Sequence, residues 1–278
     1  MTKLQGRVAL ITGGARGQGR AHAVALAREG ADIVLIDVPA TVESVPYPLA
    51  DQADLEETIA QVQAQGRRAL GITADVRDMT ALRAAVARTI STLGAVDIVV
   101  ANAGIVTYHQ LSEMDDQTWQ DMIDINLTGV ANTLRAVLPH MIDRRYGRII
   151  VTSSQAGRRG VPNLAHYSSA KWGLIGLVKT VARETAPLLG ITCNAVLPGA
   201  VDTPMMRHEE VYKVFVPGAE NPTVEDMEEG LRRENPMPVT WIEPHDISGA
   251  VVHLASEEAR YVSGTAIDIA VGFSPASF

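Results

Sequence analysis

The feature that most restricts the fold of this chain is a series of short apolar runs rich in β-branched residues. Runs that are apolar at almost every position, rather than at every second one, are typical of strands buried on both faces of a parallel sheet. Seven such runs alternate with segments of helical length, at residues 7–12, 32–37, 68–74, 96–101, 147–152, 191–197 and 265–270. The pattern predicts an α/β fold with a seven-stranded parallel sheet and helices on both faces.

The segments between these runs carry the spacing of amphipathic helices. Residues 20–30 and 81–94 have apolar side chains three and four positions apart and end in glycine, a common helix C-terminal signal. The longest helices are expected from about Asp115 to Arg145 and from Asn163 to Ala186. Because no internal repeat or linker interrupts the pattern, we expect a single domain of residues 1–278.

Charge and composition favour small-molecule chemistry. The chain has a formal net charge of −8, whereas a surface for nucleic acid or anionic lipid would need clustered Lys and Arg. The single cysteine, Cys193, lies in an apolar run and is expected to be a buried thiol, which suggests a reducing compartment. The N-terminal residues have the pattern of neither a signal peptide nor a membrane span, so we expect a cytoplasmic protein.

A glycine-rich turn follows the first apolar run. The stretch TGGARGQG (12–19) places Gly13, Gly17 and Gly19 directly before a helix. Without side chains there, the backbone can approach a pyrophosphate, whose charge is met by the N–H groups of the helix N-terminus. A plain tight turn is the alternative. The functional interpretation is a doubly wound, Rossmann-type dinucleotide site, to which Arg16 and Gln18 also belong.

Asp37 ends the second apolar run and makes the dinucleotide interpretation more specific. A carboxylate there can accept hydrogen bonds from both hydroxyls of an adenosine ribose, although an acid that only opens a turn is the alternative. A 2′-phosphate about 4 Å away would be repelled by about 4 kcal/mol or more at an effective dielectric constant near ~20. Arg16 could attract such a phosphate, but Val38 and Pro39 follow Asp37 where a second basic residue would be needed. We therefore expect NAD to be preferred over NADP.

Further cofactor contacts are expected where the next two runs end. Asp75 and Val76 close the third run and would lie near the adenine. The small residues Asn102, Ala103 and Gly104 let the end of the fourth run pack close to the cofactor. The histidines have no paired ligand spacing, so no metal site is expected.

Three side chains suited to proton transfer follow the fifth run. Ser154 lies at the end of a central strand, where α/β sheets bind ligands. Tyr167 and Lys171 are close in a helical stretch and project from one face, about one turn apart. A cation about 4 Å from a tyrosine favours the phenolate by about 4 kcal/mol, or roughly three pKa units, at an effective dielectric constant near ~20. Lys171 can thus make Tyr167 a usable base, the alternative being an ordinary exposed helix pair.

The order and spacing of these motifs resemble the short-chain dehydrogenase/reductase family over nearly the whole chain. The shared elements are T-G-x3-G-x-G from Thr12, N-A-G from Asn102, S-x12-Y-x3-K from Ser154, and P-G at Pro198. The resemblance implies an NAD-dependent alcohol dehydrogenase or ketone reductase, in which hydride passes between a substrate carbon and the nicotinamide.

The resemblance also implies a role for each matching catalytic residue. Tyr167 is the general acid/base, and Ser154 hydrogen-bonds the substrate oxygen. Lys171 also holds the nicotinamide ribose. Asn126, in DINLT (124–128), keeps a water on the lysine for a proton relay.

The segment that begins at Pro198 is expected to hold the nicotinamide and cover the substrate. By resemblance, the backbone of Val201 and the hydroxyl of Thr203 hold the carboxamide. Residues 198–242 are rich in proline and are expected to form a substrate lid. Its apolar side chains would suit a hydrophobic alcohol or ketone, or would only pack the lid onto the body: Met205, Met206, Phe215, Met227, Met237 and Trp241.

A second long connection, residues 38–50, follows Asp37 and contains Pro39, Pro46 and Pro48. It exceeds the usual length of about two to six residues, and its prolines restrict its conformations. We expect this insertion to cover the adenosine half of NAD, so that the dinucleotide does not exchange freely. A surface role or an oligomer contact is the alternative.

Within the family, the chain is similar to a subgroup of carveol dehydrogenases described as coupled to the peptide-derived redox cofactor mycofactocin. ARGQGRAHA (15–23) and VPYPLA (45–50) carry this resemblance. It implies oxidation of a secondary, carveol-like alcohol and a redox partner that reoxidises bound NADH. One alternative is a 3-oxoacyl-thioester (acyl-carrier-protein) reductase, against which Asp37 and the acidic run EDMEE (225–229) argue. The other is a non-catalytic dinucleotide-binding sensor.

The resemblance extends to the assembly. The two long helical segments, 115–145 and 163–186, resemble the pair through which family members dimerise, and residues 272–278 could reach a neighbouring subunit. We expect a homotetramer.

Overall fold

Seven parallel strands form one sheet in the computed structural model, which describes residues 2–38, 41–216 and 218–272. Their order is β3-β2-β1-β4-β5-β6-β7. This confirms the predicted Rossmann-type fold, and it places a topological switch point between β1 and β4, where such sheets bind ligands. The strands are β1 (Val8–Thr12), β2 (Asp32–Asp37), β3 (Ala69–Thr73), β4 (Ile98–Ala101), β5 (Gly147–Thr152), β6 (Ile191–Pro198) and β7 (Ala266–Ile269).

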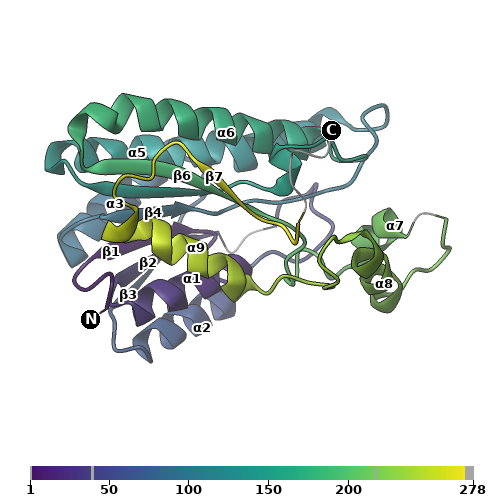
Figure 1. Ribbon diagram of the computed structural model, residues 1–278, viewed down its shortest axis with the longest axis horizontal. Coiled ribbons are helices and arrows are strands. Elements are labelled where there is room, and N and C mark those ends of the chain that lie inside the picture. Colours follow the sequence, from purple (N-terminus) through teal and green to yellow (C-terminus); the bar gives the residue numbers. More distant parts are fainter. Residues whose placement is uncertain (1, 39–40, 217, 273–278) are drawn as a thin grey trace.

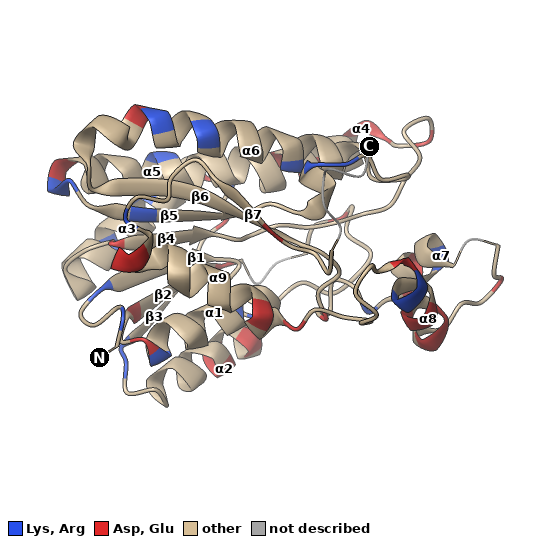
Figure 2. Cartoon of the chain, viewed as in Figure 1, with Lys and Arg blue, Asp and Glu red and all other residues tan. Residues whose placement is uncertain are grey.

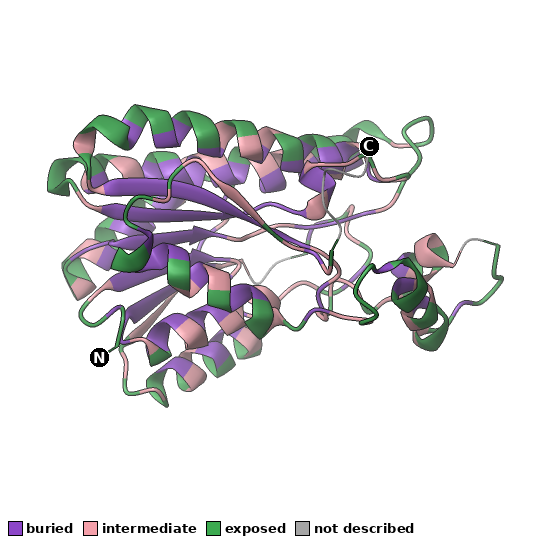
Figure 3. Ribbon diagram, in the orientation of Figure 1, coloured by how far each residue is buried: buried purple, intermediate pink, exposed green. Residues whose placement is uncertain are grey.

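Helices cover both faces of the sheet (Figure 1). One face carries α1 (Gly17–Arg28), α2 (Gln52–Gln63) and α9 (Pro244–Ala255), and the other carries α3 (Met79–Leu93), α5 (Gly129–Arg144) and α6 (Ala165–Thr185). The five inner strands are therefore buried on both sides, as Figure 3 shows, which is why they are apolar at nearly every position, whereas the edge strands β3 and β7 are only partly buried. Cys193 on β6 is fully buried, and this burial raises the pKa of its thiol to about 12.

The segment expected as one helix from Asp115 to Arg145 is interrupted. It consists of α4 (Asp116–Ile123), a π-helical turn at Asp124–Thr128, and α5. The expected helical segment is thus present from Asp116 to Arg144, and the π turn within it was not predicted, because hydrophobic spacing does not reveal a local change of hydrogen-bond register. Such π turns are frequent at functional sites, and this one carries Asn126.

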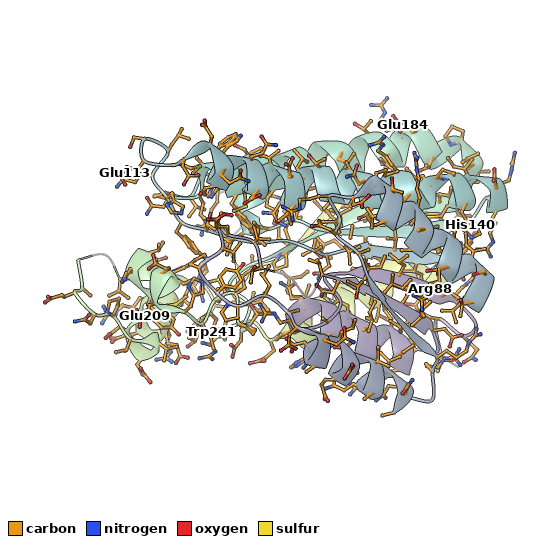
Figure 4. The ribbon with its side chains drawn as sticks, turned by 180° about the vertical axis from the view of Figure 1, so that it is seen from behind. Arg88, Glu113, His140, Glu184, Glu209 and Trp241 are labelled. Carbon is orange, nitrogen blue, oxygen red and sulfur yellow. The ribbon has the colours of Figure 1, made fainter. Side chains whose placement is uncertain are left out.

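The expected lid is built around two helices beyond the carboxyl ends of the strands. These are α7 (Glu209–Phe215) and α8 (Val224–Glu234), which project from the body in Figure 1. In the reverse view of Figure 4, Glu209 and Trp241 mark this end of the molecule, and Arg88 and His140 lie at the opposite end. At the base of the lid, Val201 forms a parallel bridge with Ile242.

Some expectations fall outside the described residues or are not tested by the fold. Pro39, Pro217 and residues 273–278, which include most of the expected subunit-contacting tail, are not described. The division of residues 1–278 into one domain with an insertion and a lid remains a prediction. In the described ranges, no helix is both long enough and apolar enough to cross a membrane.

Candidate active site

A cleft of about 490 Å³ lies at the carboxyl ends of the central strands. This volume falls in the range of small-molecule sites. Of the residues predicted for the site, only Gly19 and Asn126 do not line it. The cleft also takes in residues of the insertion and of the lid, so it is bounded by both long connections.

The glycine turn between β1 and α1 is closed by contacts that exclude a side chain. Gly13 has φ +63°, in the left-handed region that favours glycine. A Cβ on Gly19 would lie 1.9 Å from the carbonyl oxygen of Gly13. Gly19 therefore acts by letting the turn close, while the exposed backbone and the α1 N-terminus form a cradle that fits a pyrophosphate.

Asp37 is oriented by the backbone on both sides of its carboxylate. Its Oδ2 accepts a hydrogen bond from the N–H of Ala15 at 2.8 Å, and its Oδ1 accepts one from the N–H of Val38 at 2.9 Å. Burial raises the pKa of Asp37, and these two hydrogen bonds act against that rise. Each carboxylate oxygen keeps acceptor capacity, so Asp37 can still receive ribose hydroxyls.

Arg16 and Gln18, the polar residues of the glycine turn, have different surroundings. The Arg16 guanidinium donates a hydrogen bond to the carbonyl of Pro48, so it holds the insertion. Gln18 Oε1 is buried and has no hydrogen-bond partner within the described part of the chain. This acceptor fits a hydroxyl or N–H of a ligand in the cleft.

Asp75 and Val76 lie at the edge of the cleft, after β3. Burial tends to raise the pKa of Asp75, but the hydrogen bonds and charge of Arg77 together lower it. Its carboxylate is therefore already paired. Val76 packs against Gly129, where a Cβ would come within 2.5 Å of its side chain.

The N-A-G motif after β4 holds the glycine turn from the other side. Asn102 Nδ2 donates to the carbonyl oxygens of Thr12 and Gly13, at 3.2 Å each. The Cα of Ala103 lies 2.8 Å from the position of a Cβ on Gly13. This motif therefore shapes the cradle as well as lining it.

Tyr167 and Lys171 both lie on α6 and line the cleft, with Tyr167 partly buried and Lys171 buried. Lys171 is 4% exposed, and its Nζ donates to the carbonyl of Thr152 at 3.0 Å and lies 5.4 Å from the centre of the Tyr167 ring. Burial lowers the pKa of Lys171 to about 8. Burial also raises the pKa of Tyr167, and a hydrogen bond from Ser154 acts in the opposite direction. In the protein alone, desolvation outweighs the phenolate stabilisation expected from the lysine.

Ser154 and Asn126 are held by backbone contacts. Ser154 Oγ accepts a hydrogen bond from the N–H of Ala156 at 3.1 Å. Its own hydroxyl proton can therefore be donated to the Tyr167 side chain. The side-chain amide of Asn126 makes two hydrogen bonds with the backbone of Ile105. Its Oδ1 accepts from the Ile105 N–H, and its Nδ2 donates to the Ile105 carbonyl, each at 2.8 Å. A Cβ on Gly104 would lie 2.7 Å from Asn126 and 3.7 Å from Lys171, so Gly104 lets these two residues lie close together.

The lid base packs directly against the glycine turn. The Thr203 methyl group lies 3.4 Å from the position of a Cβ on Gly17. Val201 is buried, and Pro198 ends β6 at the cleft. The three residues expected near the nicotinamide are therefore adjacent to the cradle.

The apolar lid residues divide between the two expected roles. Met205, Met206 and Phe215 line the cleft. Met227 is fully buried in the cluster between α7 and α8, while Met237 is 58% exposed. Trp241 packs under the Arg207 guanidinium and donates from Nε1 to Glu228.

Two tyrosines of the cleft were not predicted. Tyr47 comes from the insertion and Tyr108 from the loop after β4, and burial raises the pKa of both. The only signal for Tyr47 was an aromatic residue in a proline-rich loop, which does not reveal its tertiary neighbours. Within the described ranges, no group of three or more His, Cys, Asp or Glu side chains could hold a metal ion.

Comparison with known proteins agrees with this geometry. The family described as short chain dehydrogenase matches residues 7–211. The (−)-trans-carveol dehydrogenase of Rhodococcus erythropolis is 47% identical, with 98% of this chain and 99% of that protein covered. The crystal structure of a carveol dehydrogenase from Mycobacterium avium in complex with NAD is 44% identical, covers 98% of this chain and 99% of its own, and has a TM-score of 0.95. A short chain dehydrogenase from Mycobacterium paratuberculosis, bound to NAD, is 38% identical, covers 97% of this chain and 98% of its own, and has a TM-score of 0.88.

A doubly wound sheet with a glycine cradle beside a Ser-Tyr-Lys set defines a dinucleotide-dependent oxidoreductase. The chain belongs to the short-chain dehydrogenase/reductase family.

The cradle can be tested with Gly19→Ala, since the added methyl would collide with the Gly13 carbonyl. We expect dinucleotide affinity, measured by calorimetry, to fall at least ~10-fold, a loss of about 1.4 kcal/mol. Gly249→Ala is the matched control, because nothing lies within 4 Å of a Cβ at that position. Unchanged affinity in Gly19→Ala would contradict the assignment of the cradle.

Proposed function

We propose that this chain is an NAD-dependent dehydrogenase that interconverts a hydrophobic, carveol-like secondary alcohol and its ketone. The observation that carries the proposal is that Ser154, Tyr167 and Lys171 line the same cleft as the glycine cradle and Asp37. The carveol dehydrogenases found by comparison support the substrate class.

Each polar residue of the cleft has a separate role in proton transfer or in holding the cofactor. The Ser154 hydroxyl donates to the substrate oxygen, and Tyr167 removes the alcohol proton. Lys171, while protonated, stabilises the phenolate and holds the nicotinamide ribose, and Asn126 keeps a water beside it. A nicotinamide bound in this cleft would supply the acceptor for the hydride of the carbinol carbon. Val201 and Thr203 orient the carboxamide at the lid base.

NAD is the preferred dinucleotide in this proposal. Asp37 is fixed by two backbone N–H groups, so a 2′-phosphate would meet a carboxylate that cannot easily turn away. Arg16 is the cation best placed to offset that repulsion, but its guanidinium already donates a hydrogen bond to the carbonyl of Pro48.

The insertion makes the bound NAD slow to exchange. Its described part, residues 41–50, is tied to three separate parts of the body. Arg16 donates to Pro48, Ser44 Oγ donates to Asp121 Oδ2 at 2.8 Å, and the Val106 N–H donates to Tyr47 at 3.1 Å. A retained cofactor requires a redox partner that reoxidises NADH in place, which agrees with coupling to mycofactocin.

The alternative of a 3-oxoacyl-thioester reductase is less well supported. Such an enzyme needs a basic entrance for a carrier arm, but α8, next to the cleft, begins with four acidic residues in its first six (Figure 2). A non-catalytic sensor would not need Tyr167 and Lys171 side by side in the cleft. We further propose that the chain acts as a homotetramer in the cytoplasm.

Tyr167→Phe tests the acid/base proposal. Turnover of a secondary alcohol should fall by about 10²–10⁴-fold while NAD stays bound.

The pH dependence of the wild-type protein tests the same proposal. Because burial raises the pKa of Tyr167, its phenolate is a minor form whose population grows as pH rises. Alcohol oxidation should therefore speed up with pH until Lys171, whose pKa is about 8, loses the charge that stabilises the phenolate. A Tyr167→Phe protein with normal turnover, or a sensor response without turnover, would overturn the proposal.

Arg16→Ala and Ser44→Ala test cofactor retention, because each removes one tie of the insertion from a different side. Both variants should release labelled NAD faster, by about fivefold or more for a lost hydrogen bond of about 1 kcal/mol. Exchange is measured by filtration after adding unlabelled NAD. Ser44 does not line the cleft, so faster exchange in Ser44→Ala cannot arise from a lost cofactor contact. Wild-type exchange rates in both variants would show that the insertion does not retain NAD.

A further inference from the structure

The insertion reaches beyond the adenosine side of the cleft to the catalytic tyrosine. Tyr47 is 5% exposed and forms a buried cluster with Val106 and Leu164. Tyr108, Tyr167 and Met205 pack against this cluster. A loop that begins beside Asp37 therefore supplies a side chain next to the proton-transfer site.

Tyr47 also joins the insertion to the lid. Its ring stacks on the imidazole of His208, with centroids 4.9 Å apart and planes at 30°. Burial lowers the pKa of His208, so the imidazole is neutral at neutral pH and stacks as an aromatic ring. Because the Val106 N–H fixes the Tyr47 hydroxyl at the same time, the ring is held from two directions.

An alcohol substrate would share the cleft with the dinucleotide. A single cavity of about 490 Å³ contains both the glycine cradle and the residues around Tyr167. Each side chain that bounds the substrate end therefore has a large effect on which alcohol fits, since a methylene in such a pocket changes selectivity by about 10–200-fold.

We propose that Tyr47 is a specificity-determining residue that makes the insertion one wall of the alcohol pocket and limits the size of the alcohol that fits beside Tyr167. This inference rests on the proposed alcohol dehydrogenase function. The preferred substrate class is then a compact, monocyclic secondary alcohol, held between the Tyr47 ring and the apolar lid residues Met205 and Met206.

The test compares cyclohexanol with a fused bicyclic secondary alcohol, 2-decalol. Binding to the NAD-loaded protein is measured by calorimetry, and turnover is measured with an artificial electron acceptor. In Tyr47→Ala, the ratio of affinities and the ratio of kcat/KM should both shift at least ~10-fold toward 2-decalol. Tyr47→Phe keeps the ring and should stay within about threefold of the wild-type ratios. Tyr261→Ala is the matched control, because Tyr261 is 84% exposed and does not line the cleft.

An unfolded variant, a wrong role for Tyr47 and a wrong dehydrogenase function give different results. Thermal unfolding of each variant shows whether it is folded, and Tyr47→Leu replaces Tyr47→Ala if the smaller side chain destabilises the insertion. Unchanged ratios in the folded variants would overturn the role of Tyr47 while leaving the dehydrogenase proposal intact. Binding of both alcohols to the wild-type protein without NADH formation would instead overturn the dehydrogenase proposal.

Discussion

All strands of the sheet run in the same direction, and this constraint brings the functional residues together. Their carboxyl ends meet at one edge, so β1 and β2 supply the glycine turn and Asp37 while β5 supplies Ser154. The reversal of strand order between β1 and β4 opens a crevice at that edge. Asn102 bridges the crevice by holding Thr12 and Gly13, so the same contact that closes the fold also shapes the cofactor cradle.

Desolvation decides how the catalytic pair behaves. Lys171 and Tyr167 lie together in the cleft, and desolvation opposes a charge on either of them. The neutral phenol is therefore favoured until further positive charge is brought close to it. An oxidised nicotinamide bound beside Tyr167 would carry such a charge, which gives a physical reason for the proposed retention of the cofactor.

Much of this architecture was predictable because it depends on local pattern. β2 and β5 begin and end where their apolar runs do, and Asp51 and Asp54 form the capping box that starts α2. The Ser154, Tyr167 and Lys171 set was also predictable, since its spacing is visible along the chain. The π turn around Asn126, the contact of Tyr47 with His208 and the pairing of Arg16 with Pro48 were not. They depend on hydrogen-bond register and on contacts between distant segments, and the charge argument for Tyr167 left out the opposing desolvation.

The central claim is that hydride moves from an alcohol carbon to a nicotinamide held beside Tyr167. The most direct measurement uses NAD-loaded protein and a secondary alcohol carrying deuterium at the carbinol carbon, followed by denaturation and mass spectrometry of the released dinucleotide. The account predicts one deuterium in the NADH from the wild-type protein and none in the dinucleotide from Tyr167→Phe. Released dinucleotide without deuterium, from a wild-type protein that has converted the alcohol, would contradict it.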